Sequence, residues 1–321
     1  MNRFALLSLY RSVTRHKLYA ALNIGGLAVG IAVFLVLFLF VRFETGFDRI
    51  LPGAERVWTV QRTLQFGTAP PVDIPARFEL LPLLQSDFPS LEGARMQTGR
   101  GAVQSGQIAV EEQIGLVDAN YFDLFPVPVV AGDPGEALSG PDGAVVTESM
   151  VEKYLLPGDA IGQTIEVRME EDTRLLRVAA VIADLPAQMT YRNDIFLRMP
   201  AEADDLTFFG GPVTFFSFPD EAAARDLIAK LPAFEKRNPD PSFVGPPDLL
   251  KVEQEVVPLS SLHLKEPRDR MVVATLGIVG IVALLLAMVN YINLATARAD
   301  IRAREVAIRK VLGAPRSALI G

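Results

Sequence analysis

The chain has 321 residues, a net charge of −7 and hydrophobic residues at 50% of its positions, which is a high fraction for a water-soluble protein. It has no cysteine, and this excludes disulfides, thiolate metal sites and cysteine nucleophiles. Its two histidines are too few for a multi-histidine metal site and leave little for a Ser-His-Asp triad. We therefore predict no enzymatic activity, no metal site and no cofactor.

The charge is distributed unevenly along the chain. Residues 1–20 and residues 298–321 each carry +4, so residues 21–297 carry −15. Basic residues on short segments beside membrane helices mark the cytoplasmic side. We predict that both ends are cytoplasmic and that the acidic middle is exported. No soluble basic face is left that could bind nucleic acid.

The first membrane helix is predicted at residues 18–41, which contain no charged residue. Residues 1–17 are predicted to form a cytoplasmic amphipathic segment, because Phe4, Leu7, Tyr10 and Val13 lie near one helical face. A plain cytoplasmic flank explains that segment equally well. A charged stretch, rather than a small-residue cleavage site, follows residue 41, so the helix is a retained anchor and not a signal peptide.

Residues 42–270 are predicted to form an extracytoplasmic domain in which strands and helices mix without a strict βαβ repeat, which indicates the α+β class. Residues 164–169 alternate between apolar and polar side chains, as a half-buried strand does. Strands are expected at Arg56–Leu64, Ile108–Val117, Ala144–Thr147, Thr164–Met169 and Arg174–Ala183, and helices at Ile74–Leu84, Glu148–Leu155 and Glu221–Leu231. Thr147 and Asp220 are the expected N-caps of the last two helices.

Some residues in this domain suggest chemistry but have simpler explanations. The acidic run Glu170–Asp172 is interpreted as a solvated hairpin tip, because adjacent side chains on a strand cannot all face one ion. His263 is expected to be packed or hydrogen-bonded. The five phenylalanines between positions 208 and 218 are expected to pack in the core, with an exposed partner surface as the alternative.

The second membrane helix is predicted at residues 271–297, which are also free of charge. Residues 298–321 continue as a basic, helical cytoplasmic stalk. Gly313 and Pro315 should end this helix. Close packing of the two membrane helices is expected at small residues spaced four apart, namely Gly26, Gly30, Ala283 and Ala287.

Several segments resemble ABC transporter permeases of the FtsX/MacB type. The stalk carries two of them, Asn290–Leu294 and Arg304–Ala314, with Ala307 where the family usually has glycine. The remaining segments resemble the MacB-type periplasmic core domain: Val117–Phe125, Ala131–Asp133, Val145–Glu148, Ile161–Gly162, Val181–Pro186 and Pro258–Leu264. Members of this family have four or eight membrane helices, so we expect the sequence to be truncated before a third one.

The resemblance implies the transmembrane permease subunit of a bacterial ABC transporter, for export or for mechanotransmission, in the inner membrane with residues 42–270 periplasmic. Its expected partners are a separate ABC ATPase, the lipid bilayer, a second permease half (in a dimer or pseudo-dimer) and a periplasmic adaptor. The chain itself has no G-x-x-x-x-G-K-[ST] phosphate loop. The expected ATPase-coupling residues are Glu305, Ile308, Arg309, Lys310, Leu312, Gly313 and Ala314. The alternative from topology alone is a two-helix membrane sensor with a periplasmic ligand-binding domain and a missing output domain.

Overall fold

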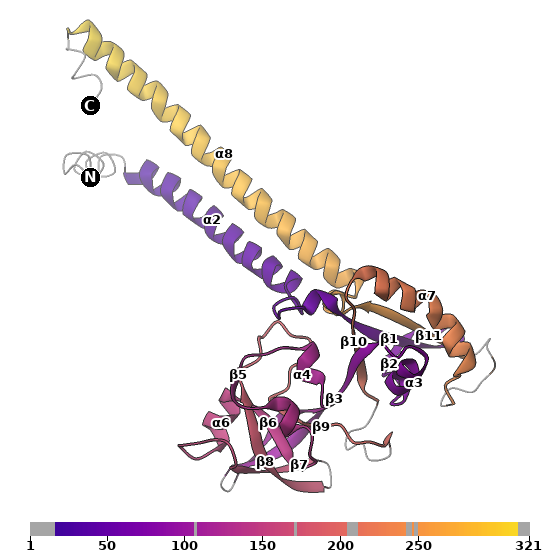
Figure 1. The fold of residues 1–321 in the computed structure, drawn as a ribbon. Helices are drawn as coiled ribbons and strands as arrows, with labels where there is room; N and C mark the ends of the chain where they lie inside the picture. Colours follow the sequence, from indigo (N-terminus) through magenta and orange to yellow (C-terminus); the bar gives the residue numbers. More distant parts are fainter. Residues whose placement is uncertain are drawn as a thin grey trace. The chain divides into compact units, whose positions relative to one another are not determined.

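The computed structural model describes residues 17–105, 108–169, 172–203, 211–241, 246 and 250–313. The chain divides into two compact units (Figure 1). One unit contains the helices α2 (Lys17–Thr45) and α8 (Pro267–Val311). The other, Gly46–His263, contains all of the described strands. The predicted amphipathic segment lies outside the described residues, except for Lys17.

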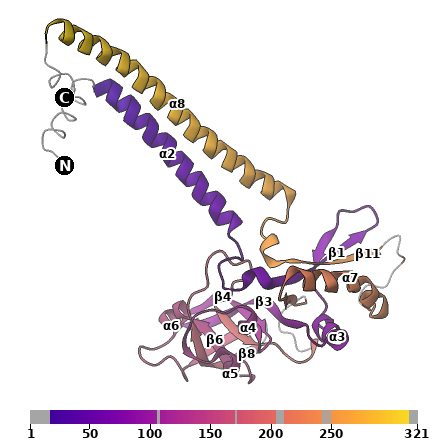
Figure 2. The same cartoon turned by 45° about the horizontal axis from the view of Figure 1, so that its top comes forward.

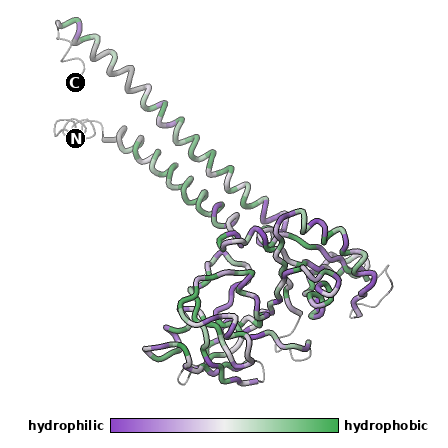
Figure 3. The backbone as a smooth tube through the Cα atoms, in the orientation of Figure 1, coloured by the Kyte–Doolittle hydropathy of each residue, from purple (hydrophilic) through white to green (hydrophobic). Residues whose placement is uncertain are grey.

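The two helices of the first unit are long and apolar. Ile24–Thr45 and Pro267–Thr296 are each long and apolar enough to cross a membrane. Figure 3 shows hydrophobic residues along most of α2 and along the first part of α8. Large side chains such as Val29 (64% exposed) and Val36 (66% exposed) point outward from α2. An apolar surface of this kind suits lipid and is unfavourable in water.

The second unit is built on one 11-stranded sheet with the order β11-β1-β10-β3-β4-β9-β6-β8-β5, to which β2 and β7 add side pairings. The strands are β1 (Val57–Phe66), β2 (Val72–Ile74), β3 (Glu92–Ser105), β4 (Ile108–Val117), β5 (Val129–Gly132), β6 (Gly143–Thr147), β7 (Thr164–Met169), β8 (Asp172–Ile182), β9 (Ile195–Arg198), β10 (Val213–Ser217) and β11 (Leu250–Pro258). The helices are α3 (Leu80–Asp87), α4 (Tyr121–Leu124), α5 (Pro134–Ala137), α6 (Glu148–Tyr154) and α7 (Glu221–Arg237), with 3-10 turns η1 (Ala54–Arg56) and η3 (Leu259–Ser261).

Six of these strands close on themselves and form what we call the barrel. Pairing runs from β3 through β4, β9, β6 and β8 to β7, and β7 pairs back to β3 at Ala102↔Arg168. The side chains of one cluster fill the barrel, among them Val103, Ile114, Val167, Leu176 and Ile195, all of which are 0% exposed. Alternation along each strand places every second residue inside, as the buried and exposed positions of β7 show.

The other part, which we call the open half, consists of β11, β1, β10 and β2 together with α3 and α7. Figures 1 and 2 both place α7 beside β1 and β11. Its core contains Trp58, Leu84, Phe216 and Phe234. A third cluster, which contains Met96, Tyr121, Phe196 and Phe215, draws residues from β3, β9 and β10, so it joins the open half to the barrel.

The structure confirms most of the predicted elements of this unit and corrects one helix. β4 and β7 have the predicted bounds, and β1, β6, β8 and α6 lie within two residues of theirs. The predicted helix Ile74–Leu84 is confirmed only from Leu80 onward, since Val72–Ile74 is strand β2 and α3 begins at Leu80. Ile74 precedes Pro75, and a residue before proline is disfavoured in the helical conformation.

The predictions for the helix N-caps and for the phenylalanines are confirmed in part. The carboxylate of Asp220 accepts a hydrogen bond from the amide of Ala223 at 2.9 Å and caps α7, whereas the Thr147 side chain makes no capping bond to α6. α7 continues past Pro232, before which the predicted helix ended, to Arg237. Phe215, Phe216 and Phe218 are buried in the core as expected. Phe208, Phe209 and two residues of the acidic run, Glu170 and Glu171, lie outside the described residues.

Candidate functional site

The two membrane helices approach each other at small residues. A Cβ atom built on Gly30 would overlap the Cβ of Ala287 and lie 3.4 Å from the carbonyl oxygen of Ala283. A Cβ on Gly26 would lie 3.0 Å from the Asn290 side chain. The four expected packing residues therefore lie between α2 and α8, and the absence of a side chain at Gly30 sets how closely the two backbones pack.

The stalk is a direct continuation of α8. The helix continues without a break for fifteen residues beyond Thr296, to Val311. It ends where the sequence predicted: Leu312 caps it and Gly313 adopts a φ of 78°. The side chains of Ile308 (62%), Val311 (87%) and Leu312 (80%) are exposed near this end. Lys310 is exposed as well, and the side chains of Glu305 and Arg309 and the whole of Ala314 lie outside the described residues.

Polar and aromatic contacts hold the first and last residues of the unit Gly46–His263. The ring of Phe47 stacks on that of His263, with 3.4 Å between centroids and 4° between planes. Asp48, which is 6% exposed, accepts hydrogen bonds from the amide of Thr190 at 2.8 Å and from its hydroxyl. It is the one non-glycine residue in the described part with a positive φ, of 54°. Burial raises the pKa of Asp48, and the bonds from Thr190 partly oppose this rise.

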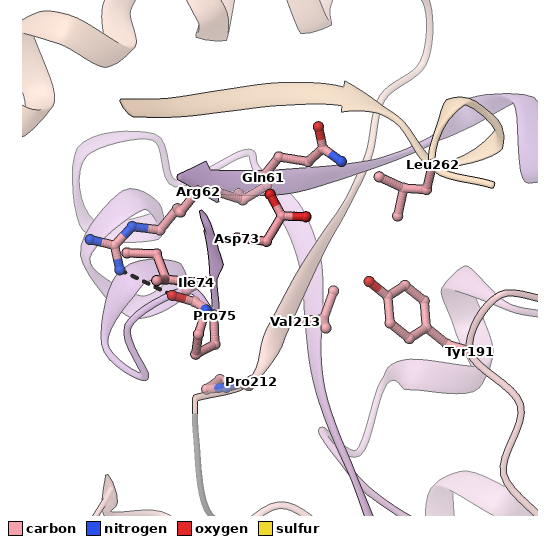
Figure 4. A pocket seen from close by; sticks show the side chains of 11 residues that line it. Gln61, Arg62, Asp73, Ile74, Pro75, Tyr191, Pro212, Val213 and Leu262 are labelled. Carbon is pink, nitrogen blue, oxygen red and sulfur yellow. Dashed lines mark hydrogen bonds between the residues drawn. The ribbon is translucent and has the colours of Figure 1, made fainter. Parts of the chain in front are cut away.

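A hollow of about 250 Å³ lies in the same unit, between strands of the open half and the loop that joins β8 to β9 (Figure 4). Two polar groups that the figure shows facing it are the carboxylate of Asp73 on β2 and the hydroxyl of Tyr191, from the loop between β8 and β9. Gln61 of β1 lines it too, and Val60, Val213 and Leu262 contribute apolar walls. Burial, followed by the charges of Asp48 and Asp73, raises the pKa of Tyr191 to about 12, so its hydroxyl keeps its proton at neutral pH.

Residues of the resembling motifs in the unit Gly46–His263 hold the sheet together. In the first motif, Asp118 accepts hydrogen bonds from the backbone amide of Arg95 at 2.7 Å and from its guanidinium at 2.8 Å. The motif then turns into α4 and buries Tyr121 and Phe125 in the joining cluster. In another motif, Asp184 accepts bonds from the amide and hydroxyl of Ser149, which lower the pKa of its carboxyl group. Among the described residues, no group of three metal-ligating side chains gathers.

The chain matches the family described as the MacB-like periplasmic core domain over residues 20–233, about two thirds of its length. The chain belongs to this family. It is accordingly an ABC transporter permease of the MacB/FtsX type, a membrane protein whose two apolar helices flank a periplasmic α+β domain. Family membership favours this class over the two-helix sensor.

The fold is also found in a solved structure. A domain of a putative permease protein from Porphyromonas gingivalis shares 20% identity and a TM-score of 0.52, covering 66% of this chain and 92% of that one. The periplasmic region of MacB from Actinobacillus actinomycetemcomitans has 12% identity and a TM-score of 0.43, with coverage of 64% and 91%. The extracellular domain of the noncanonic ABC-type transporter YknZ from Gram-positive bacteria has 8% identity and a TM-score of 0.39, with coverage of 60% and 99%. No curated protein matches the chain.

Sequence reasoning did not find the hollow or the Asp48 contacts. The residues that line the hollow come from β1, β2, β10, the loop at Tyr191 and the end of the domain at Leu262. Nothing in their spacing along the sequence indicates that they meet. For Asp48, which lies between Phe47 and Arg49, the sequence gives no sign that the carboxylate is buried.

Proposed function

We propose that this permease couples ATP hydrolysis by a separate ABC ATPase, docked at the cytoplasmic end of α8, to movement of its periplasmic domain. The observation that carries the proposal is the single 45-residue helix α8, which leads from the domain through the apolar span to an exposed apolar end. At a rise of 1.5 Å per residue, it is about 68 Å long. An unbroken helix of that length is suited to transmitting displacement between its two ends.

The proposed docking surface is the end of the stalk. Ile308, Val311 and Leu312 are exposed at helical spacings of three and four, so they form one apolar face suited to a groove on a partner. Lys310 adds a positive charge beside them, and Glu305 and Arg309 at spacing four can stiffen the helix. Gly313 and Ala314 complete the proposed contact. Binding of the same segment to anionic lipid is the competing outcome.

In this proposal, the positive charge of the two ends sets the orientation of the chain in the membrane. The +4 flanks place both termini in the cytoplasm and residues 42–270 in the periplasm. The chain binds no nucleotide itself, consistent with the missing phosphate loop. The family resemblance adds a second permease half and a periplasmic adaptor to the proposed assembly, and efflux to its proposed roles.

Replacing Glu305 with lysine in the full-length protein tests the coupling. The change places like charges at spacings three and four from Arg302 and Arg309, which costs a few tenths of a kcal/mol within the helix, or about 0.2–0.5 per pair. A like-charge contact with a partner costs several times more. We expect a several-fold loss of ATPase co-purification, with the melting temperature of the periplasmic domain unchanged.

The matched control is Asp300→Lys, which makes the same charge change five residues earlier on a different face of α8. It should retain the ATPase. If Glu305→Lys also retains the ATPase and its stimulated turnover, the docking assignment is wrong and the lipid-surface role replaces it.

Close approach of α2 and α8 is the second structural requirement of the proposal. Gly30→Leu should force the helices apart, because even a Cβ atom at Gly30 overlaps Ala287, and overpacking of this kind costs about 1–3 kcal/mol. Gly25→Leu is the control in the same helix, because a Cβ atom on Gly25 meets nothing within 4 Å.

The readout for Gly30→Leu is disulfide formation between cysteines at Leu37 and Gly280, where a Cβ built on Gly280 lies 3.2 Å from that of Leu37. Because the native chain has no cysteine, the introduced pair is the only thiol pair present. Gly30→Leu should slow this cross-link several-fold and Gly25→Leu should not. Equal cross-linking in both variants contradicts the packing assignment.

A further inference from the structure

An aromatic stack joins the two chain ends of the unit Gly46–His263. The rings of Phe47 and His263 lie face to face, with 3.4 Å between their centroids and 4° between their planes. One residue, Gly46, separates Phe47 from the end of α2 at Thr45. Three residues separate His263 from the start of α8 at Pro267. The stack therefore connects the point where the chain enters the unit with the point where it leaves.

The connections between the stack and the two helices are short. Two residues span at most about 7 Å when fully extended and four residues at most about 14 Å, so neither connection has slack for a long displacement. The connection to α8 is also stiffened, because the guanidinium of Arg270 in the first turn donates to the carbonyl oxygen of Lys265 at 2.6 Å. A displacement of either helix therefore pulls on the ring next to it in the chain.

The direction of the Phe47 ring is set by Asp48, the residue that follows it. The Asp48 amide donates to the carbonyl oxygen of Gln188 at 2.8 Å, and its carboxylate accepts from the amide and the hydroxyl of Thr190. Asp48 is 6% exposed, and its φ of 54° is uncommon for a residue other than glycine. Three hydrogen bonds thus hold the chain beside Phe47 in one conformation, fastened to the loop between β8 and β9.

His263 follows closely on the paired strands β1 and β11. These strands form nine antiparallel residue pairs, which end at Trp58↔Pro258. Between this last pair and His263, Leu259 is 3% exposed in the joining cluster, and Leu262 packs against the same cluster. A pull on His263 therefore passes through a seated segment of only a few residues into β11 and its partner β1.

We propose that the stack of Phe47 on His263 is the joint through which the two membrane helices act together on the periplasmic domain. Phe47 and His263 are positioning residues of the coupling: they hold the two helix connections side by side, so that a shift of α8 relative to α2 is passed on to β1 and β11. When the rings separate, each connection follows its own helix and the shift is not passed on. This inference rests on the coupling function proposed above, but the joint is tested without the ATPase.

The test asks whether a constraint between α2 and α8 changes the ends of β1 and β11. The full chain in lipid nanodiscs carries the cysteine pair at Leu37 and Gly280 described above, whose disulfide ties the two helices together and is reversed by a reductant. Hydrogen exchange at the start of β1 and at the end of β11 is compared between the oxidised and reduced forms, with β4 of the barrel as internal reference. With the stack intact, we expect oxidation to slow this exchange several-fold.

Ring variants separate the joint from general stability. Phe47→Ala and His263→Ala should abolish the difference between the oxidised and reduced forms, whereas His263→Phe keeps an aromatic ring opposite Phe47 and should retain it. Phe122→Ala is the control. Phe122 is partly buried, as Phe47 is, and its ring meets that of Tyr121 edge to face with 5.3 Å between centroids. Its loss should speed exchange in both forms alike and leave their ratio unchanged.

Three results would overturn the proposal. The first is an absence of any effect of the disulfide when the stack is intact. The second is an unchanged ratio in Phe47→Ala, which is what a merely structural role predicts. The third is a loss of the ratio in His263→Phe, because a ring is still present there.

If Phe47→Ala melts early, Phe47→Leu provides the same comparison, since it keeps an apolar side chain and removes only the ring. An unchanged ratio in Phe47→Leu then overturns the proposal. The ATPase takes no part in this measurement. Failure of the joint therefore leaves docking at the stalk standing, and failure of the docking assignment in Glu305→Lys leaves the joint standing.

Discussion

The barrel and the open half of the periplasmic domain enclose their hydrophobic cores in different ways. In the barrel, β7 bridges β8 and β3, so the six strands pair in a closed circuit around their own side chains. In the open half, β11 lies at the end of the sheet, and α3 and α7 supply the other side of the core. β11 carries Lys251, Glu253 and Glu255 at exposed positions, and charges on an edge strand discourage pairing with another chain.

The two regions of the domain differ in where they leave space for a binding site. The interior of the barrel is occupied by buried side chains such as Val103, Ile114 and Val167, which are 0% exposed. The hollow at Tyr191 forms where strands β1, β2 and β10 of the open half meet the loop between β8 and β9. The following three changes test how independent the two regions are.

The largest effect is expected from Phe234→Ala in α7. Phe234 is 0% exposed in the core of the open half, and removing such a ring costs about 3–5 kcal/mol. Hydrogen exchange of the full chain should show lost protection in α7, β1 and β11, with the barrel strands less affected. The fluorescence of Trp58, the only tryptophan and part of this core, should report the same loss.

Ile228→Ala is the control on the same helix, because Ile228 is 37% exposed and contributes less to the core. It should leave protection close to that of the parent chain. Equal loss of protection in β4, β6 and β9 after Phe234→Ala would mean that the two regions unfold as one unit.

A smaller effect is expected inside the barrel from Gly101→Ala. A Cβ atom on Gly101 would overlap the Cδ1 of Ile114 and lie 3.1 Å from Cγ1 of Val167. Overpacking of a core costs about 1–3 kcal/mol. The midpoint of chemical unfolding measures the loss.

Ile114→Val removes the overlapped Cδ1 atom and alone costs about 0.5–1.5 kcal/mol. Because the two sites touch, their effects should not add, and the double variant should be more stable than the sum of the two losses predicts. Additive losses would show that the strain in Gly101→Ala does not come from this contact.

The smallest of the three effects is expected at Asp48, which fastens the start of the domain to the loop between β8 and β9. Asp48→Ala removes two hydrogen bonds to Thr190 and should cost about 1–2 kcal/mol. Asp48→Asn should cost less, because asparagine can still accept from the Thr190 amide and tolerates a positive φ.

The pH dependence of the unfolding free energy separates the effect of the Asp48 charge from that of its hydrogen bonds. Burial raises the pKa of Asp48 above its usual value of 3.8, so the folded state holds this proton more tightly than the unfolded state does. The stability due to this shift is fully present below pH 3.8 and is lost as the pH rises through the raised value. Unfolding free energies of the parent chain and of Asp48→Asn should therefore diverge at low pH, in favour of the parent chain. A constant difference between them from pH 3 to pH 7 contradicts the shift.

Local sequence signals predicted those elements that depend on local physics. The end of α8 at Leu312 and Gly313 follows from a glycine that adopts a positive φ, and β4 and β7 follow from composition and alternation. The signal failed at Ile74, where a following proline outweighed an apolar spacing typical of a helix. It also missed β2, β3, β5, β9, β10 and β11, of which β2, β5 and β9 are only three or four residues long and too short for a periodic signal.

The sequence by itself determined the two apolar spans, the α+β class, the family and the small residues Gly30 and Ala287 of the membrane helices. These features depend on hydrophobic length, periodicity and motifs that are read along the chain. Only the tertiary structure decided that β7 closes the barrel, that Gly30 faces Ala287, and that Asp73 and Tyr191 share one hollow. Each of these depends on residues far apart in sequence, whose meeting is fixed by strand pairing and side-chain packing across the whole unit and not by any local preference.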